Sequence, residues 1–201
     1  MAFIGSTTLW HRKTMNDHHL IMGELTDYLT GQTRDDTHDE RYLQKIARML
    51  ILEKRYDRSE IRSGLIVDVQ ADARTACVPV AFTIALSGRA AMLIHYGPGS
   101  LVTRHRPALA LARLAAADQI PVVVVTNGEQ ADILDGLTGK VTGAGLAEIP
   151  SKEQLEKRLK NHVWATVSPE RAKMEARIVM AYEVDDRCPC DSTICVKEID
   201  G

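Results

Sequence analysis

The stretch VAFTIALSGRAAMLIHYGPG, residues 80–99, constrains the fold more than any other part of this chain. Two apolar runs, each about as long as a β-strand, are joined by the turn residues Ser87, Gly88 and Arg89. Both runs are apolar almost throughout instead of alternating with polar residues, which is typical of central strands covered on two faces. The sequence therefore predicts a hairpin at the centre of a sheet, with helices on both sides.

Segments around this hairpin predict a mixed α/β domain. Thr37 and Glu40 form a capping box at the start of a helix, and Ser151 and Ser168 are placed to cap two surface helices. Pro79 counts against full pairing near the start of its strand. The other predicted elements are strands over 64–70, 77–86, 90–96 and 120–128, a helix over 106–119 with Pro107 in its first turn, and a short exposed hairpin over 131–142.

The order strand, helix, strand over 90–128 predicts a crossover with parallel pairing, and hence a mixed central sheet flanked by helices. We expect residues 1–21 to be a disordered or mis-assigned N-terminal extension. Residues 22–150 would form the domain, and 151–201 a helical, Cys-rich C-terminal appendage. The chain has 201 residues and a net charge of −2, so overall charge does not indicate a nucleic-acid partner. No apolar run is long enough to span a membrane, and we expect a cytoplasmic protein.

Two stretches resemble a known family. HDERYLQKIARMLILEKRYDRSEIR, from His38, is similar to its first helix, and IPVVVVTNG, from Ile120, matches a P-x-x-x-x-T-N-G strand end followed by a short hairpin. The family is the N-terminal nuclease domain of type I restriction enzyme R subunits, within the PD-(D/E)XK nuclease superfamily. The resemblance covers about residues 22–150 and is strongest to free-standing bacterial versions of the domain. It implies a restriction-endonuclease-like fold.

The resemblance also implies a metal-dependent catalytic site on the central hairpin. In this family an Asp on one strand and a Glu on the next hold a divalent ion, and a Lys two residues after the Glu orients the attacking water. Those positions fall on Ala81, Leu93 and His95 of this chain. None of the three can fill the role that the family gives it.

Acidic residues are missing from an acid-free window around these three positions as well. No Asp or Glu occurs from residue 73 to residue 117, although the chain has 27 acidic residues. Glu40 and Asp68, outside the window, are weak candidates to rescue a metal site together with His95. Glu40 is also well placed to serve its helix N-terminus, and Asp68 to face solvent. Mg²⁺ is expected only if such a site is retained.

The same window carries arginines with no acid nearby in the sequence. Arg89, Arg104, Arg106 and Arg113 could form an edge that contacts DNA phosphates. Alternatively, they could be ordinary arginines whose acidic partners come from other parts of the chain. The sequence leaves both interpretations open.

A cysteine cluster near the C-terminus suggests metal or redox chemistry. Cys188, Cys190 and Cys195 lie within eight residues, and thiolates bind zinc or iron–sulfur clusters strongly. A fourth ligand could come from Cys77, Asp191, a histidine such as His162, or a second chain. A redox-active or incidental cluster is the alternative.

We therefore expect a restriction-modification protein that has the nuclease fold without the catalysis, a pseudoenzyme acting as a DNA-binding or assembly module with DNA or a protein as partner. One alternative is an active metal-dependent endonuclease with an unusual site. Another is a thiolate metal or redox sensor on the same scaffold. Oligomeric state cannot be read from the sequence.

Overall fold

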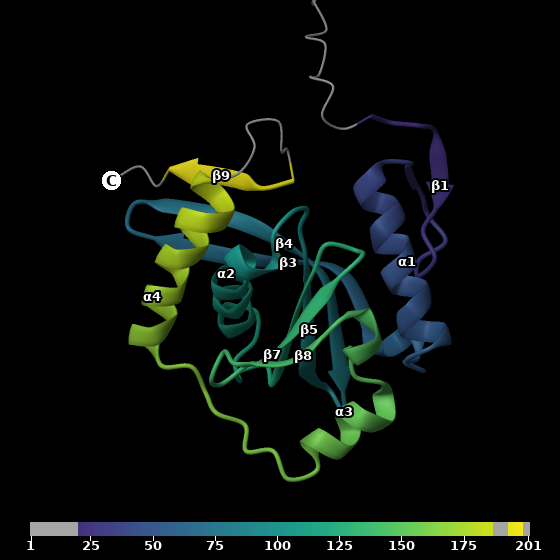
Figure 1. Cartoon of the computed structure of the whole chain (residues 1–201). Coiled ribbons are helices and arrows are strands. Elements are labelled where there is room, and N and C mark those ends of the chain that lie inside the picture. The colour runs from purple at the N-terminus through teal and green to yellow at the C-terminus, as the bar shows by residue number, and fades with distance from the viewer. Residues whose placement is uncertain (1–19, 187–192, 199–201) are drawn as a thin grey trace, which may run out of the picture.

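The computed structural model describes residues 20–186 and 193–198. Within them, six strands follow each other in a sheet in the order β3-β4-β5-β6-β7-β8, a seventh strand, β9, pairs with β4, and β1 and β2 form a separate hairpin (Figure 1). The strands are β1 (Glu24–Thr26), β2 (Thr33–Asp35), β3 (Ile61–Ala71), β4 (Arg74–Leu86), β5 (Arg89–Tyr96), β6 (Val122–Thr126), β7 (Ala131–Asp135), β8 (Val141–Ala144) and β9 (Cys195–Glu198). The helices are α1 (His38–Leu52), α2 (Leu101–Leu114), α3 (Lys152–Leu159) and α4 (Pro169–Val179), which continues into a π-helical segment (Met180–Asp185).

The sheet is mixed, as the sequence predicts. β5 and β6 pair in parallel, with Leu93 opposite Val123, and the other neighbouring strands pair antiparallel. α2 makes the connection between the two parallel strands. This strand–helix–strand unit is the crossover expected from residues 90–128.

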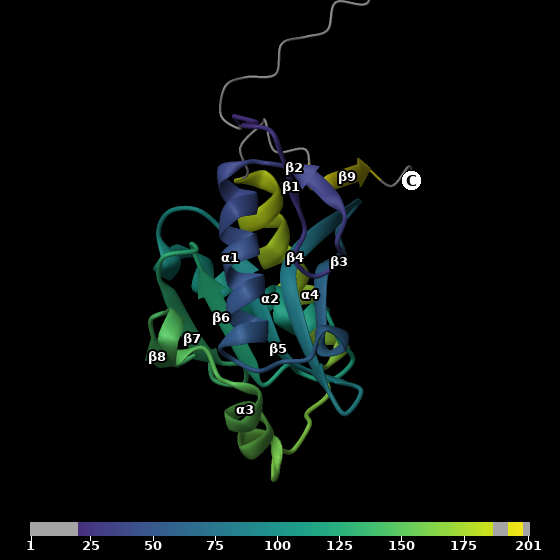
Figure 2. The same cartoon turned by 90° about the vertical axis from the view of Figure 1, so that its right-hand side faces the viewer.

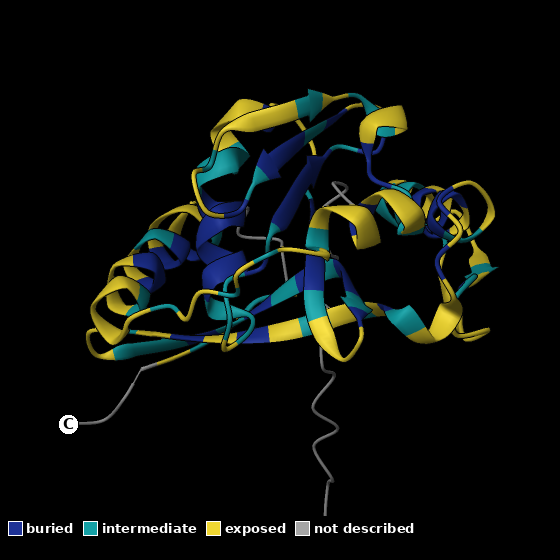
Figure 3. Ribbon diagram, turned by 90° about the horizontal axis from the view of Figure 1, so that it is seen from below, coloured by how far each residue is buried: buried dark blue, intermediate teal, exposed yellow. Residues whose placement is uncertain are grey.

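Helices cover both faces of the sheet. α1 lies on one face, while α2 and α4 lie on the other (Figures 1 and 2). Each face has its own apolar cluster, one built with α1 and α3 and the other with α2 and α4. In Figure 3 the buried segments lie along the inner strands and the inward faces of the helices. The apolar runs of the sequence are therefore strands covered from both sides.

Two local predictions need correction at α2 and at the 131–142 hairpin. α2 begins at Leu101, so Pro107 lies inside the helix and not in its first turn. The chain enters the helix directly from the Gly-Pro-Gly-Ser loop, five residues earlier than Pro107 suggested. The hairpin over 131–142 forms as β7 and β8, but β7 is largely buried because it pairs with β6 on one side and β8 on the other.

Pro79 is also tolerated in a more central position than the sequence suggested. It lies within β4, opposite Ile66 of β3. On the other edge of β4, β9 pairs with residues 74–77 and β5 with residues 82–86. Pro79 falls in the gap between those two partners, where a missing N–H disrupts no ladder.

The helix caps are confirmed, with one difference at α1. The side chain of Thr37 accepts a hydrogen bond from the Glu40 N–H, but the Glu40 carboxylate accepts from Gln44 and does not complete the capping box. Ser151 and Gln154 form the full box at α3, and Ser168 caps α4 ahead of Pro169.

The expected C-terminal appendage is not confirmed. Side chains of α4 and the π-helical segment belong to the same buried cluster as α2, and β9 joins the main sheet. At the other end, β1 and β2 pair before α1, within the part of the chain that was expected to form the domain. None of the helices described is both long and apolar enough to cross a membrane.

Candidate functional site

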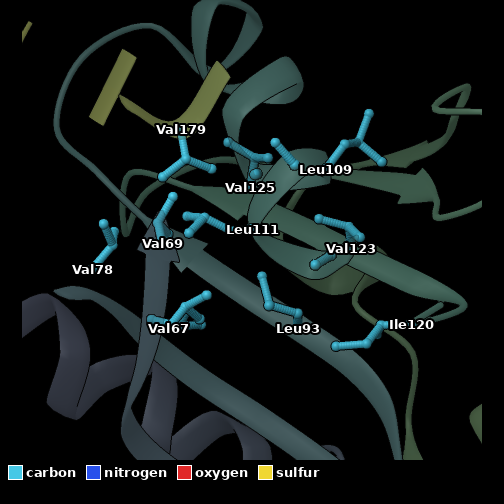
Figure 4. Close-up of a cluster of buried hydrophobic side chains, with 14 of the residues drawn as sticks. Val67, Val69, Val78, Leu93, Leu109, Leu111, Ile120, Val123, Val125 and Val179 are labelled. Carbon is cyan, nitrogen blue, oxygen red and sulfur yellow. The ribbon is translucent and has the colours of Figure 1, made fainter. Parts of the chain in front are cut away.

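The three positions that the family would use for catalysis do not form a site. Leu93 is fully buried in the apolar cluster on the α2 side of the sheet, where Figure 4 shows it among Val67, Val123 and other side chains. Ala81 packs against the opposite cluster, on the α1 side. The two side chains therefore belong to different cores and cannot share one ion.

His95 has a buried acidic neighbour from the C-terminal part of the chain. Its Nε2 lies 3.3 Å from Oε1 of Glu183, in the π-helical segment, and both side chains are at most 10% exposed. The pair links β5 to the end of α4. It provides one imidazole and one carboxylate, which is fewer ligands than a metal site of this kind needs.

Aligning the three catalytic positions of the family one residue later, on Phe82, Ile94 and Tyr96, also gives no metal site. Phe82 and Ile94 pair directly across β4 and β5, and together with Tyr96 they pack on the α1 side of the sheet. The Tyr96 hydroxyl donates to the carboxylate of Asp39 at 2.7 Å. Burial and this hydrogen bond raise the pKa of Tyr96, which therefore stays protonated. In neither register does a carboxylate or lysine stand on the central strands.

The two rescue candidates lie far apart in the fold. Glu40 is in the first turn of α1, on one face of the sheet, and Asp68 lies opposite Cys77 on the β3–β4 hairpin. His95 contacts Glu183 on the other face from α1. Across residues 20–186 and 193–198, no three His, Cys, Asp or Glu side chains are grouped to hold a metal ion.

Two of the four candidate DNA-binding arginines bind a buried glutamate. Glu175 of α4 is fully buried, and Arg113 donates to it at 2.8 Å, with Arg106 and Arg171 as further partners. Burial raises the pKa of Glu175, but hydrogen bonds from Arg106 and Arg171 and the charge of Arg113 outweigh it, so the pKa lies below its ordinary value. These arginines hold α2 against α4.

The other two arginines lie at opposite ends of β5. Arg89 begins the strand, where its guanidinium stacks 5.2 Å from the Trp164 ring and lies 3.7 Å from Asp118. Arg104 is in the first turn of α2, beyond the other end of β5. A strand of eight residues spans about 26 Å. The four arginines consequently do not line one surface.

Arg104 belongs to a polar site where β5 and α2 meet. Its guanidinium lies over Gly97 and donates to the Pro98 carbonyl at 3.0 Å, and it makes none of the ion pairs found within the described residues. The first turn of α2 has no acidic residue, and the Ser100 side chain does not cap the helix. Free backbone N–H groups at a helix start, next to an arginine, favour an anion.

The T-N-G sequence that ends β6 lies beside Arg104 and forms a tight turn. The Asn127 side chain accepts from the N–H groups of Glu129 and Gln130 and donates to the Gly99 carbonyl. Gly128 has φ +86°, and a Cβ there would strike the Tyr42 ring. Its carbonyl accepts from Lys45 of α1. The motif thus joins β6, α1 and the loop before α2, a structural role that sequence reasoning missed.

A groove lies beside α1 and is lined by side chains of that helix, of β1 and of the 146–148 turn. Its volume is about 660 Å³. Its lining includes the apolar side chains Leu25 and Leu146 and the charged side chains Arg41, Lys45, Arg48 and Glu53. Arg41 is paired with Asp36. Sequence reasoning missed this groove because the 146–148 turn, which completes it, is far from α1 in the sequence.

Of the cysteines expected to bind metal, Cys188 and Cys190 lie outside the described residues. Cys195 is in β9, directly opposite Cys77 of β4. Cys77, raised earlier only as one of several possible fourth ligands, is thus a structural neighbour of Cys195. Metal binding at this cluster stays a prediction.

A comparison with protein families agrees with the resemblance in the sequence. The family model described as the type I restriction enzyme R protein N terminus matches residues 38–150, more than half of the 201 residues. The match runs from the first residue of α1 to the end of the turn after β8, and so includes the central hairpin and the T-N-G turn. No curated protein and no solved structure matched the chain. The chain belongs to the family of type I restriction enzyme R protein N termini.

Proposed function

We propose that this protein is a nuclease-fold module that does not cleave DNA and that binds the phosphate backbone of nucleic acid beside α2. The observation that carries the first half is the apolar centre of the sheet. Leu93, Phe82 and Ile94 are buried there, and neither face of β4 or β5 presents a carboxylate. With Glu183 beside His95 as one carboxylate near these strands, the site has too few hard oxygen ligands to hold the divalent ion that phosphodiester hydrolysis requires in this fold.

The surface around Arg104 supports the second half. The first turn of α2 combines unfilled backbone N–H groups, an arginine without an acidic partner among the described residues, and a Gly-Pro-Gly-Ser loop that allows close approach of a ligand. It lies where the parallel strands β5 and β6 end, a location at which α/β folds often bind ligands. A backbone phosphate is the ligand that this chemistry suits best, and it carries no sequence information.

Binding is tested by fluorescence anisotropy with labelled 20-base-pair DNA at several salt concentrations. We expect Arg104→Ala to weaken binding for all sequences and to reduce the salt slope by about 1, the value for one phosphate contact. Arg89→Ala is the matched control, because Arg89 lies at the other end of β5 and already has Asp118 and Trp164 as neighbours. No binding at low salt, or equal losses in both variants, would contradict the proposal.

The groove on α1 favours assembly with a protein as a second candidate function. Its apolar lining and the basic side chains among its charged residues, Arg48 above all, suit a partner segment with apolar and acidic side chains. Arg48→Glu should weaken such binding and leave Arg104-dependent DNA binding largely intact, because Arg48 does not contact the T-N-G turn. Pull-down with the candidate subunits of a restriction-modification system, using Arg48→Glu and Arg104→Ala, separates the two functions.

A further inference from the structure

The outer face of the β3–β4 hairpin holds a row of three reactive side chains. Asp68 of β3 lies opposite Cys77 of β4, and Cys77 lies opposite Cys195 of β9. Asp68 and Cys195 therefore flank Cys77 from its two neighbouring strands, close enough to raise the pKa of the Cys77 thiol. Directly opposed residues of antiparallel strands are the pairs whose Cβ atoms come closest.

The side chains in this row are accessible to solvent, while the side chains on the other face of β9 pack against the apolar core. Cys195 is exposed and Cys77 half-buried. The neighbours of Cys195 along the chain, Ile194 and Val196, pack against the apolar cluster of α2 and α4. The alternation along the strand therefore turns the thiols outward, towards a small reagent in solution.

We propose that Cys77 and Cys195 form a thiol–disulfide exchange site that accepts small-molecule disulfides and closes into a bond fastening β9 to β4. This inference does not depend on DNA binding. It needs only the two opposed thiols, both of which are free in the described structure.

The reaction proceeds in two exchanges that balance. The Cys195 thiolate attacks the small disulfide and forms a mixed disulfide, and the departing thiolate takes up a proton. Cys77 then loses its proton and attacks the Cys195 sulfur, so that the second half of the reagent leaves and is protonated. Two protein thiols are oxidised to one disulfide, and one small disulfide is reduced to two thiols.

The surroundings of the two thiols determine the order of these steps. The hydrogen bond and negative charge of Asp68, together with burial, raise the pKa of Cys77. Cys195 is the more exposed of the two thiols. Cys195 is therefore the thiol that meets the reagent first, and Cys77 is the resolving thiol.

The test is oxidation of the full chain by mixtures of oxidised and reduced glutathione, followed by alkylation and peptide mass mapping. Trypsin releases Cys77 in residues 75–89 and the three C-terminal cysteines together in residues 188–197. Replacing Cys188 and Cys190 by serine leaves Cys195 as the one cysteine of the second peptide. In this double variant we expect a crosslink between the two peptides, and hydrogen exchange of β9 amides slowed at least tenfold after oxidation.

Single variants complete the test. Adding Cys77→Ser to the double variant should leave a stable glutathione adduct on Cys195, because the resolving thiol is gone. Failure of the double variant to form the 77–195 crosslink would overturn the proposal, as would a wild-type disulfide found only within residues 188–197. One equivalent of tightly bound zinc, lost on replacing Cys77 or Cys195, would also overturn it in favour of a metal site.

Discussion

The centre of the sheet and the interface between α2 and α4 differ in how many charged side chains they bury. On β4 and β5, where the resemblance places the metal ligands of the family, the buried side chains are apolar except for Thr83 and His95. Between α2 and α4, Glu175 is fully buried and bound by Arg106, Arg113 and Arg171. The chain thus buries a cluster of one carboxylate and three arginines between two helices, whereas its central strands have only the contact between His95 and Glu183.

This difference explains the acid-free window. Four of the five arginines of residues 73–117 have acidic partners elsewhere in the chain: Arg74 binds Asp185, Arg89 lies near Asp118, and Arg106 and Arg113 bind Glu175. An imbalance of charge within one stretch of sequence therefore does not indicate a ligand site. Arg104 remains the candidate, because among the described residues it forms no ion pair.

The largest effect is expected from placing a carboxylate on the central strands. Leu93→Glu would restore the residue type that the family uses, but it would bury an unpaired charge in the α2-side core. We expect a loss of about 5 kcal/mol or more in the free energy of unfolding, and no nuclease activity. Leu93→Met, which conserves volume, should cost less than about 1.5 kcal/mol. Urea titration measures both, and a stable Leu93→Glu protein would show that this centre can accept charge.

Removing the charge between α2 and α4 should have the next largest effect. Glu175→Gln leaves Arg113, which is 8% exposed, without its anion. We expect a loss of about 3–5 kcal/mol in the free energy of unfolding. Glu170→Gln, at an exposed position of the same helix, should cost less than about 1 kcal/mol. Equal effects of the two substitutions in denaturant titrations would show that the cluster contributes little.

The pH dependence of stability sharpens the same contrast. The pKa of Glu175 lies below its ordinary value of 4.5 in the folded protein. Its contribution is therefore fully present above about pH 4.5 and is lost as pH falls through the lower, folded-state pKa. The difference in unfolding free energy between wild type and Glu175→Gln should shrink below pH 4.5. A difference that stays constant from pH 7 to pH 3 would contradict this.

The smallest effect is expected at the end of the sheet, where Tyr96 binds Asp39. Tyr96→Phe removes a hydrogen bond at a half-buried site and should cost about 1 kcal/mol of unfolding free energy. Tyr42→Phe is the control, because its hydroxyl binds Glu129 in a more exposed place. If thermal or urea unfolding shows a larger loss of unfolding free energy for Tyr42→Phe than for Tyr96→Phe, the Tyr42 hydroxyl stabilises this region more than the Tyr96–Asp39 hydrogen bond, which would contradict the prediction.

Much of the fold was predictable because its signals are local. The apolar runs, the Ser87-Gly88-Arg89 turn and the caps Thr37, Ser151 and Ser168 all lie within a few residues of the element they define. The start of α2 was missed because Pro107 has the features of a first-turn residue, although the helix tolerates it further in.

The candidate site was less predictable because its contacts are long-range. Glu175 lies 62 residues from Arg113, and no local pattern connects them. The face on which Leu93 lies was also hidden, because β5 is apolar on both sides and a shift of one residue changes no pattern. The pairing of Cys77 with Cys195 needed a strand, β9, that only the three-dimensional structure places.

The most direct test of the central claim is a cleavage assay with the purified full chain. Supercoiled plasmid, linear duplex and single-stranded DNA are incubated with Mg²⁺ or Mn²⁺, with time courses followed on gels. We predict no metal-dependent products, because neither face of the central strands can hold the ion. Metal-dependent cutting that is lost in His95→Ala, Asp68→Asn or Glu40→Gln would contradict the account.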